Sequence, residues 1–128
     1  MFLFGKKKAH KSQEQQMLSD DDRKTLIKQA EEKALALECL DEEQQVPLLN
    51  EMGSLYFQAE QWDEAIQFYE KSLSIKREMG KPYTNLMTLY NKKRQKAAQA
   101  KNDEEIRFYF DKVQEMMQMS KDMLRGKL

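Results

Sequence analysis

The stretch GSLYFQAEQWDEAIQFYEKSL, which starts at Gly53, constrains the fold more than any other part of the chain. Its small residues Gly53, Ala65 and Ser72 stand 12 and 7 positions apart, with aromatic residues between them. Small side chains allow two helices to approach closely, so this spacing places Gly53 and Ala65 where two antiparallel helices cross. We therefore predict a helical hairpin made of residues 46–59 and 63–78.

Composition indicates one soluble, mostly helical domain. Of the 128 residues 34% are charged and 40% are hydrophobic, and there are only four glycines and two prolines. A membrane-spanning helix needs a run of about 18 apolar residues, and the sequence contains no such run. The lone Cys39 excludes an internal disulfide and fits a reducing, cytoplasmic compartment. We expect Cys39 to pack near a helix end, because free cysteines are often buried.

Further helices follow from capping and periodicity. The segment SDDDRK begins a helix, with Ser19 or an aspartate as the cap. Apolar residues then recur at helical spacing as far as Leu40, and the polar segment 41–45 forms a break or a frayed join. These apolar residues are Leu26, Ile27, Ala30, Ala34, Leu35 and Leu37.

Two prolines, Pro47 and Pro82, stand 35 positions apart, which indicates a helical repeat. Each fits the first turn of a helix, where a missing N–H costs nothing. Asp63 is the expected cap of the second helix of the hairpin. The predicted fold is all-α, a right-handed helical-hairpin solenoid of five helices at residues 20–40, 46–59, 63–78, 82–101 and 103–125.

The residues of the hairpin resemble a tetratricopeptide repeat (TPR), a helix-turn-helix unit of 34 residues. Seven residues, counted from Val46, match the family's order of large, large, small, aromatic, small, aromatic and small. They are Leu49, Met52, Gly53, Tyr56, Ala65, Tyr69 and Ser72. Arg77 departs from the pattern, since proline is usual there. The resemblance identifies one clear repeat at about 46–79.

A second, degenerate repeat covers about 80–125. Its first part repeats the pattern at an offset of 34, through Tyr83, Leu86, Met87 and Tyr90. Its second part, DEEIRFYFDK, echoes DEAIQFYEKS at an offset of 40, so we expect a longer hairpin. Met87 and Glu105 replace the glycine and alanine of the crossing, and a regular crossing is therefore not expected.

The resemblance implies protein–protein binding in a concave groove lined by the first helix of each pair. Amides and hydroxyls there suit an extended peptide backbone, and Phe57 offers an apolar anchor. The alternative is that these residues are only the solvated faces of two helices. Carried over by position, the groove residues are Asn50, Glu51, Ser54, Phe57, Gln58, Thr84, Asn85, Thr88, Asn91 and Lys92.

The sequence offers few candidates for catalytic residues. His10 is the only histidine and lies in a segment that we interpret as a flexible basic tail, residues 1–18. No glycine-rich phosphate loop occurs, and the acidic clusters resemble helix starts. We expect residues 19–128 to form a single non-enzymatic domain without a cofactor or metal ion.

Two other segments are candidate contact sites. The helix that contains VQEMMQMSKDML carries Met116, Met119 and Met123, whose soft side chains suit a partner or a homodimer contact. The alternative is ordinary packing. At the N-terminus, MFLFGKKK could place aromatic rings and lysines at an anionic inner membrane surface, as a weak peripheral contact. These residues are Phe2, Leu3, Phe4, Lys6, Lys7 and Lys8.

Charge is distributed unevenly although the net charge is zero. Residues 20–79 carry 7 basic and 15 acidic side chains, a net charge of −8, and residues 80–128 carry 11 basic and 6 acidic, a net of +5. The basic helix face NKKRQKAAQAK within the second half suggests an alternative function, nucleic-acid binding. The acidic first half and the lack of a recognised nucleic-acid module disfavour it. The leading hypothesis is an adaptor or scaffold that binds a protein segment.

Overall fold

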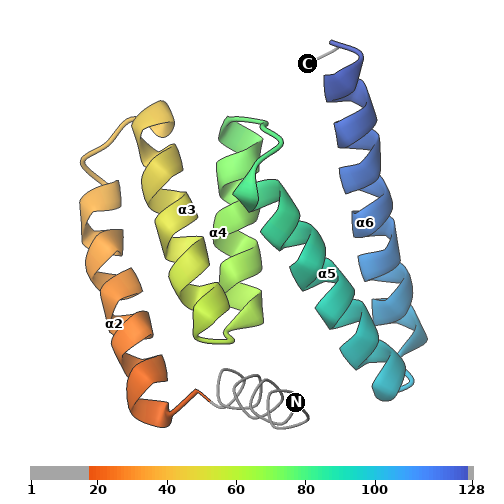
Figure 1. Cartoon of the computed structure of the whole chain (residues 1–128), viewed down its shortest axis with the longest axis horizontal. Coiled ribbons are helices and arrows are strands. Elements are labelled where there is room, and N and C mark those ends of the chain that lie inside the picture. The colour runs from red at the N-terminus through yellow and green to blue at the C-terminus, as the bar shows by residue number, and fades with distance from the viewer. Residues whose placement is uncertain (1–17, 127–128) are drawn as a thin grey trace, which may run out of the picture.

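The computed structural model describes residues 18–126, and this part of the chain consists of helices joined by short connections (Figure 1). It contains five α-helices and no strand, in agreement with the predicted all-α class. The helices are α2 (Asp20–Leu37), α3 (Glu42–Gln58), α4 (Trp62–Ile75), α5 (Lys81–Gln99) and α6 (Asp103–Leu124). The tail predicted at residues 1–18 lies almost wholly outside the described residues.

Each helix packs against the next one in the chain. The contacting pairs are α2 with α3, α3 with α4, α4 with α5, and α5 with α6. Figure 1 shows the five helices side by side in chain order, each running back along its predecessor. None of these helices has the length and apolar character needed to cross a membrane.

Helix α3 begins four residues before the predicted start, because the polar segment was wrongly interpreted as a break. Asp41 caps this helix: its carboxylate accepts a hydrogen bond from the Gln44 N–H at 2.9 Å, and the Gln44 side chain accepts one from the Asp41 N–H at 3.2 Å. This reciprocal capping box satisfies two backbone donors. Pro47 consequently lies inside α3, whereas we predicted that it lies in the first turn of the helix. Pro82 does occupy the start of α5.

One hydrophobic core cluster lies between α4, α5 and α6. Its buried residues are Ala65, Tyr69, Leu73, Leu86, Leu89, Tyr90, Val113 and Met116. Gly53 and Ala65 are both buried, as expected for a close helix crossing. A Cβ atom at Gly53 would lie 2.9 Å from the Tyr69 ring, so Gly53 packs directly against this ring. Glu105, at the position corresponding to Ala65, is exposed.

The two hairpins, α3–α4 and α5–α6, close with the same turn. Glu60 and Lys101 adopt the left-handed conformation, with φ angles of 62° and 56°. The residue after each of them donates its N–H to a carbonyl five positions earlier, Gln61 to Tyr56 and Asn102 to Ala97, both at 2.9 Å. This is the Schellman motif, which satisfies carbonyls at a helix C-terminus. Gln61, and not Asp63, precedes α4 as its N-cap.

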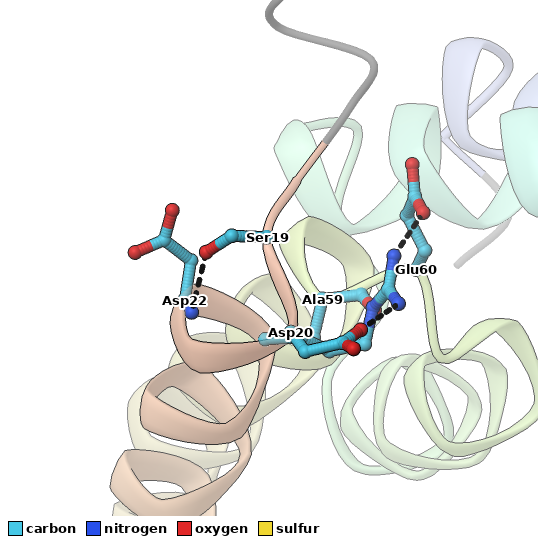
Figure 2. Close-up of polar contacts among 6 residues, drawn as sticks. Ser19, Asp20, Asp22, Ala59 and Glu60 are labelled. Carbon is cyan, nitrogen blue, oxygen red and sulfur yellow. Dashed lines mark hydrogen bonds and ion pairs between the residues drawn. The ribbon is translucent and has the colours of Figure 1, made fainter.

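Arg23 of α2 holds the C-terminus of α3. Its Nε donates to the Ala59 carbonyl at 3.0 Å, and its NH2 group donates to Glu60 at 2.7 Å (Figure 2). A cation at this place also complements the negative end of the helix dipole. Ser19 caps α2 by accepting a hydrogen bond from the Asp22 N–H at 3.0 Å.

The end of α2 departs from the expectations. Cys39 follows the helix and is exposed, so the prediction that it packs in the interior is wrong. Leu35 is also exposed, and Ala30 is the only buried residue of α2. Helix α2 packs mainly against α3, so a narrow apolar face is enough to dock it.

Candidate functional site

Helices α3 and α5 carry the ten residues predicted to bind a partner, and α4 packs against both of them. We call these residues, together with the α4 side chains between them, the α3–α5 strip. Two α4 residues, Trp62 and Tyr69, are seven positions apart and so lie about two turns apart on the same face. Each of them joins a residue of α3 to a residue of α5.

Tyr69 makes the first junction. Asn85 of α5 donates from Nδ2 to the Tyr69 hydroxyl at 3.0 Å. Burial of Tyr69 raises its pKa above 10.0, and hydrogen bonds with the Asn85 and Ser54 side chains offset part of that rise. The Ser54 hydroxyl of α3 also accepts a hydrogen bond from Gln58 Nε2 at 3.1 Å. Polar side chains from α3 and α5 therefore lie close to one hydroxyl of α4.

Trp62 makes the second junction. The Phe57 ring of α3 lies with its centroid 5.8 Å from that of Trp62, at an interplanar angle of 55°. The Lys92 ammonium of α5 lies 5.2 Å from the centroid of the same indole, within the range of a cation–π interaction. An apolar anchor and a positive charge thus stand next to each other at this end of the strip.

At the opposite end of α3, Asn50 lines a cleft of about 440 Å³ between the start of α3 and the end of α4. Val46 and Pro47 form one wall of this cleft, and Ile75 and Lys76 contribute the other. The Oδ1 atom of Asn50 is buried and has no hydrogen-bond partner within residues 18–126. A buried acceptor of this kind costs about 1–3 kcal/mol while it stays unpaired.

The remaining predicted residues are partly engaged within the chain. Glu51 pairs with Lys33 of α2 at 3.2 Å and is therefore held toward α2. The Thr88 hydroxyl donates to the Thr84 carbonyl at 3.1 Å, and Asn91 Nδ2 donates to the Met87 carbonyl at 3.2 Å. Both hydrogen bonds connect successive turns of α5. Thr84 and Thr88 are nevertheless exposed.

The methionines predicted as a second contact site lie mainly against the core. Met116 is buried, and its carbonyl accepts a hydrogen bond from the Tyr83 hydroxyl at 3.0 Å. Met119 packs against the core cluster, and Met123 is half-buried. The packing alternative therefore describes Met116 and Met119. The exposed apolar residues of α6 are others, and Met117 is among them.

The predicted membrane contact, from Phe2 to Lys8, and His10 lie outside the described residues. Within residues 18–126, no three histidine, cysteine, aspartate or glutamate side chains gather in a way that could hold a metal ion.

Comparison with protein-family models, curated proteins and solved structures finds no match for this chain. The assignment of a function therefore depends on the residues and geometry of the chain itself.

Sequence reasoning missed two parts of the strip, both of them in α4. Trp62 was assigned to the turn, but it is the first residue of α4. Tyr69 was predicted as a packing residue, and its hydroxyl was not expected to join two helices. The spacing of seven residues between the two aromatic side chains was the available signal, because it places them on one face.

Proposed function

We propose that this chain is a non-enzymatic adaptor or scaffold that binds a segment of another protein along the α3–α5 strip. The observation that carries the proposal is the double junction: Asn85 donates a hydrogen bond to the Tyr69 hydroxyl, near the Ser54 side chain, and Phe57 and Lys92 both lie against the Trp62 ring. Two helices are thereby joined into one surface with polar groups in the middle and an apolar anchor at one end.

We infer a TPR-like arrangement in which α3 and α5 are the inner helices of a concave groove. Three observations support it: the spacing of Gly53 and Ala65, the burial of both residues, and the shared turn at Glu60 and Lys101. Hairpins that repeat the same turn stack in the same sense, which produces the curvature of helical-repeat proteins.

The chemistry of the strip suits an extended peptide. Asn85 uses one N–H for Tyr69 and makes no other side-chain hydrogen bond within the described chain, which leaves its carbonyl oxygen for a ligand N–H. Phe57 is half-buried beside Trp62 and would receive an apolar side chain. Lys92 adds a cation that would favour a carboxylate near that end of the peptide.

The experiment begins with affinity capture of a partner from the native cell, followed by calorimetric titration of the purified pair. Replacing both Phe57 and Asn85 with Ala should weaken binding by more than about 2 kcal/mol, or about 30-fold in Kd. The control is Gln67→Ala together with Lys71→Ala, since these exposed α4 residues are about half a helix turn away from Tyr69. Circular dichroism must show that each variant is folded.

A partner that binds the Phe57/Asn85 variant as tightly as wild type would show that the strip is not the binding surface. Substitution of Met123 by Ser tests the competing contact on α6, because Met119 packs against the core. If only that variant loses binding, the interaction belongs to α6 and the groove proposal is wrong.

Nucleic-acid binding through residues 92–101 remains the alternative hypothesis, although the contacts of two lysines weaken it. Lys93 forms an ion pair with Asp63 at 2.7 Å, and Lys92 lies over Trp62. Affinity for RNA or DNA that falls steeply with salt would favour this alternative, whereas salt-tolerant capture of a protein would favour the adaptor. We propose the cytoplasm as the setting, and sedimentation with anionic vesicles tests contact with the inner membrane surface.

A further inference from the structure

Three exposed apolar residues form a stripe along α6. Phe110, Met117 and Leu124 are seven positions apart, so they lie on one face, and they are 45%, 43% and 81% exposed. They are three of the six large hydrophobic residues that are exposed in the described chain. Their alignment distinguishes them from scattered surface residues, which need no explanation.

The stripe borders a cavity of about 590 Å³ between α5 and α6. Ala98 of α5 and Ile106 and Phe110 of α6 supply its apolar lining. Arg94 and Arg107 also line it. We call the cavity together with the stripe the Phe110 surface.

In the first hairpin, a helix covers the position that corresponds to Phe110. At the offset of 40 residues between the two similar segments, Phe110 corresponds to Glu70 of α4, and the next helix, α5, covers Glu70. Tyr90 of α5 donates a hydrogen bond from its hydroxyl to the Glu70 carboxylate. On α6 no described helix takes the place of α5, and a phenyl ring replaces the carboxylate. A helix docked there would therefore meet an apolar side chain where α5 meets an acid.

The charges beside the stripe are mainly positive. Arg94 and Arg107 make no ion pair with any carboxylate of residues 18–126, and Lys121 lies two heptads beyond Arg107 on the same side of α6. Asp103 is the acidic residue of the cavity. This pattern complements a helix that carries acidic side chains beside its apolar face.

We propose that the Phe110 surface binds an amphipathic helix of another protein whose apolar face is flanked by aspartate or glutamate. Two other occupants have the wrong charge. The N-terminal segment of this chain is basic through Lys6, Lys7 and Lys8. A symmetric contact with a second copy would bring Arg107 and Lys121 of the two copies near one another, where like charges repel.

This surface shares no residue with the α3–α5 strip, so the two proposals can fail separately. Phe108 supplies a matched control, because it is also on α6 and is 53% exposed. It lies on the far side of Arg107 from Phe110, in a neighbouring depression that Glu104, Arg107 and Asp111 also line. Its ring contacts Lys112, whose ammonium lies 5.5 Å from the ring centroid, and it makes an edge contact with Tyr109.

The test uses the full chain and two designed helical peptides that share one stripe of leucines, flanked in one peptide by glutamates and in the other by lysines. Fluorescence anisotropy measures both affinities at about 50 mM and about 500 mM salt. The glutamate peptide should bind at least about tenfold more tightly at the lower salt, and the difference should shrink at the higher. Phe110→Ser should weaken its binding by about tenfold or more, whereas Phe108→Ser should leave it unchanged. Arg94→Glu together with Arg107→Glu should reverse the preference between the peptides.

Failure of the glutamate peptide to bind, equal affinities for the two peptides, or equal losses in the Phe108 and Phe110 variants would overturn the proposal. Sedimentation velocity of the chain alone tests the remaining occupant. Self-association that Phe110→Ser abolishes would assign the surface to a second copy and would likewise overturn the proposal.

Discussion

Gly53→Ala tests the close approach of α3 to α4. The added Cβ would lie 2.9–3.0 Å from three atoms of the Tyr69 ring, which is shorter than side chains tolerate. Overpacking of this kind costs about 1–3 kcal/mol, while replacing a helical glycine by alanine gains about 1 kcal/mol, so we expect a net destabilisation of up to about 2 kcal/mol. Each kcal/mol corresponds to a fall in Tm of roughly 4–8 °C for a domain of this size.

The measurement is urea and thermal unfolding followed by circular dichroism, in the wild-type and Tyr69→Leu backgrounds. Loss of the ring removes the clash and leaves the gain in helix propensity. Gly53→Ala should therefore become stabilising by up to about 1 kcal/mol in the second background. An equal effect of Gly53→Ala in both backgrounds would refute the reasoning, because the steric cost would then not come from Tyr69.

The two similar turns predict responses to glycine that differ in size. Lys101→Gly should stabilise the fold by about 0.5–1 kcal/mol, since a left-handed φ angle is strained for a residue with a Cβ. Glu60→Gly should stabilise the fold less, because it also removes the hydrogen bond from Arg23. Unfolding by urea measures both variants, and a loss of stability in Lys101→Gly would contradict the account. Stability should also fall above pH 10, because burial raises the pKa of Tyr90, and its hydrogen bond to Glu70 raises it further. The folded chain then holds the phenol proton of Tyr90 more tightly than the unfolded chain does. The contribution of Tyr90 to stability is therefore complete below pH 10 and is lost as the pH rises through the pKa of the folded state. Tyr90→Phe should make the decline shallower, and an unchanged decline would assign it to other groups.

Helix content could be predicted from periodicity, but the boundaries depended on capping chemistry. The start of α3 shows the difference: Asp41 and Gln44 stand three positions apart as a capping box requires, although their polarity alone suggests a break. The exposure of Cys39 follows from its place in the connection after α2, where no neighbouring helix covers it. A general tendency of cysteine toward burial could not anticipate that place.

The candidate site was predictable only in part. Spacing identified Ser54 and Asn85 on their own helices, but only the packing of α3, α4 and α5 shows that Asn85 donates to the Tyr69 hydroxyl and that Ser54 lies near it. On α6, Met116 and Met117 are adjacent, and one is buried while the other is exposed. A rotation of about 100° between neighbouring residues decides which one faces the core, and the sequence pattern does not fix the angle at which α6 docks.

Site-specific photo-crosslinking in the native cell tests most directly whether the α3–α5 strip binds a partner. A photoreactive phenylalanine analogue at Thr88, an exposed residue of the strip, is compared with the same analogue at Gln67, an exposed residue about half a helix turn away from Tyr69. The account predicts a discrete protein adduct from Thr88 that is absent from Gln67 and is lost when Phe57 and Asn85 are both Ala. Equal adducts from the two positions, or an adduct from Thr88 that survives the double substitution, would contradict it.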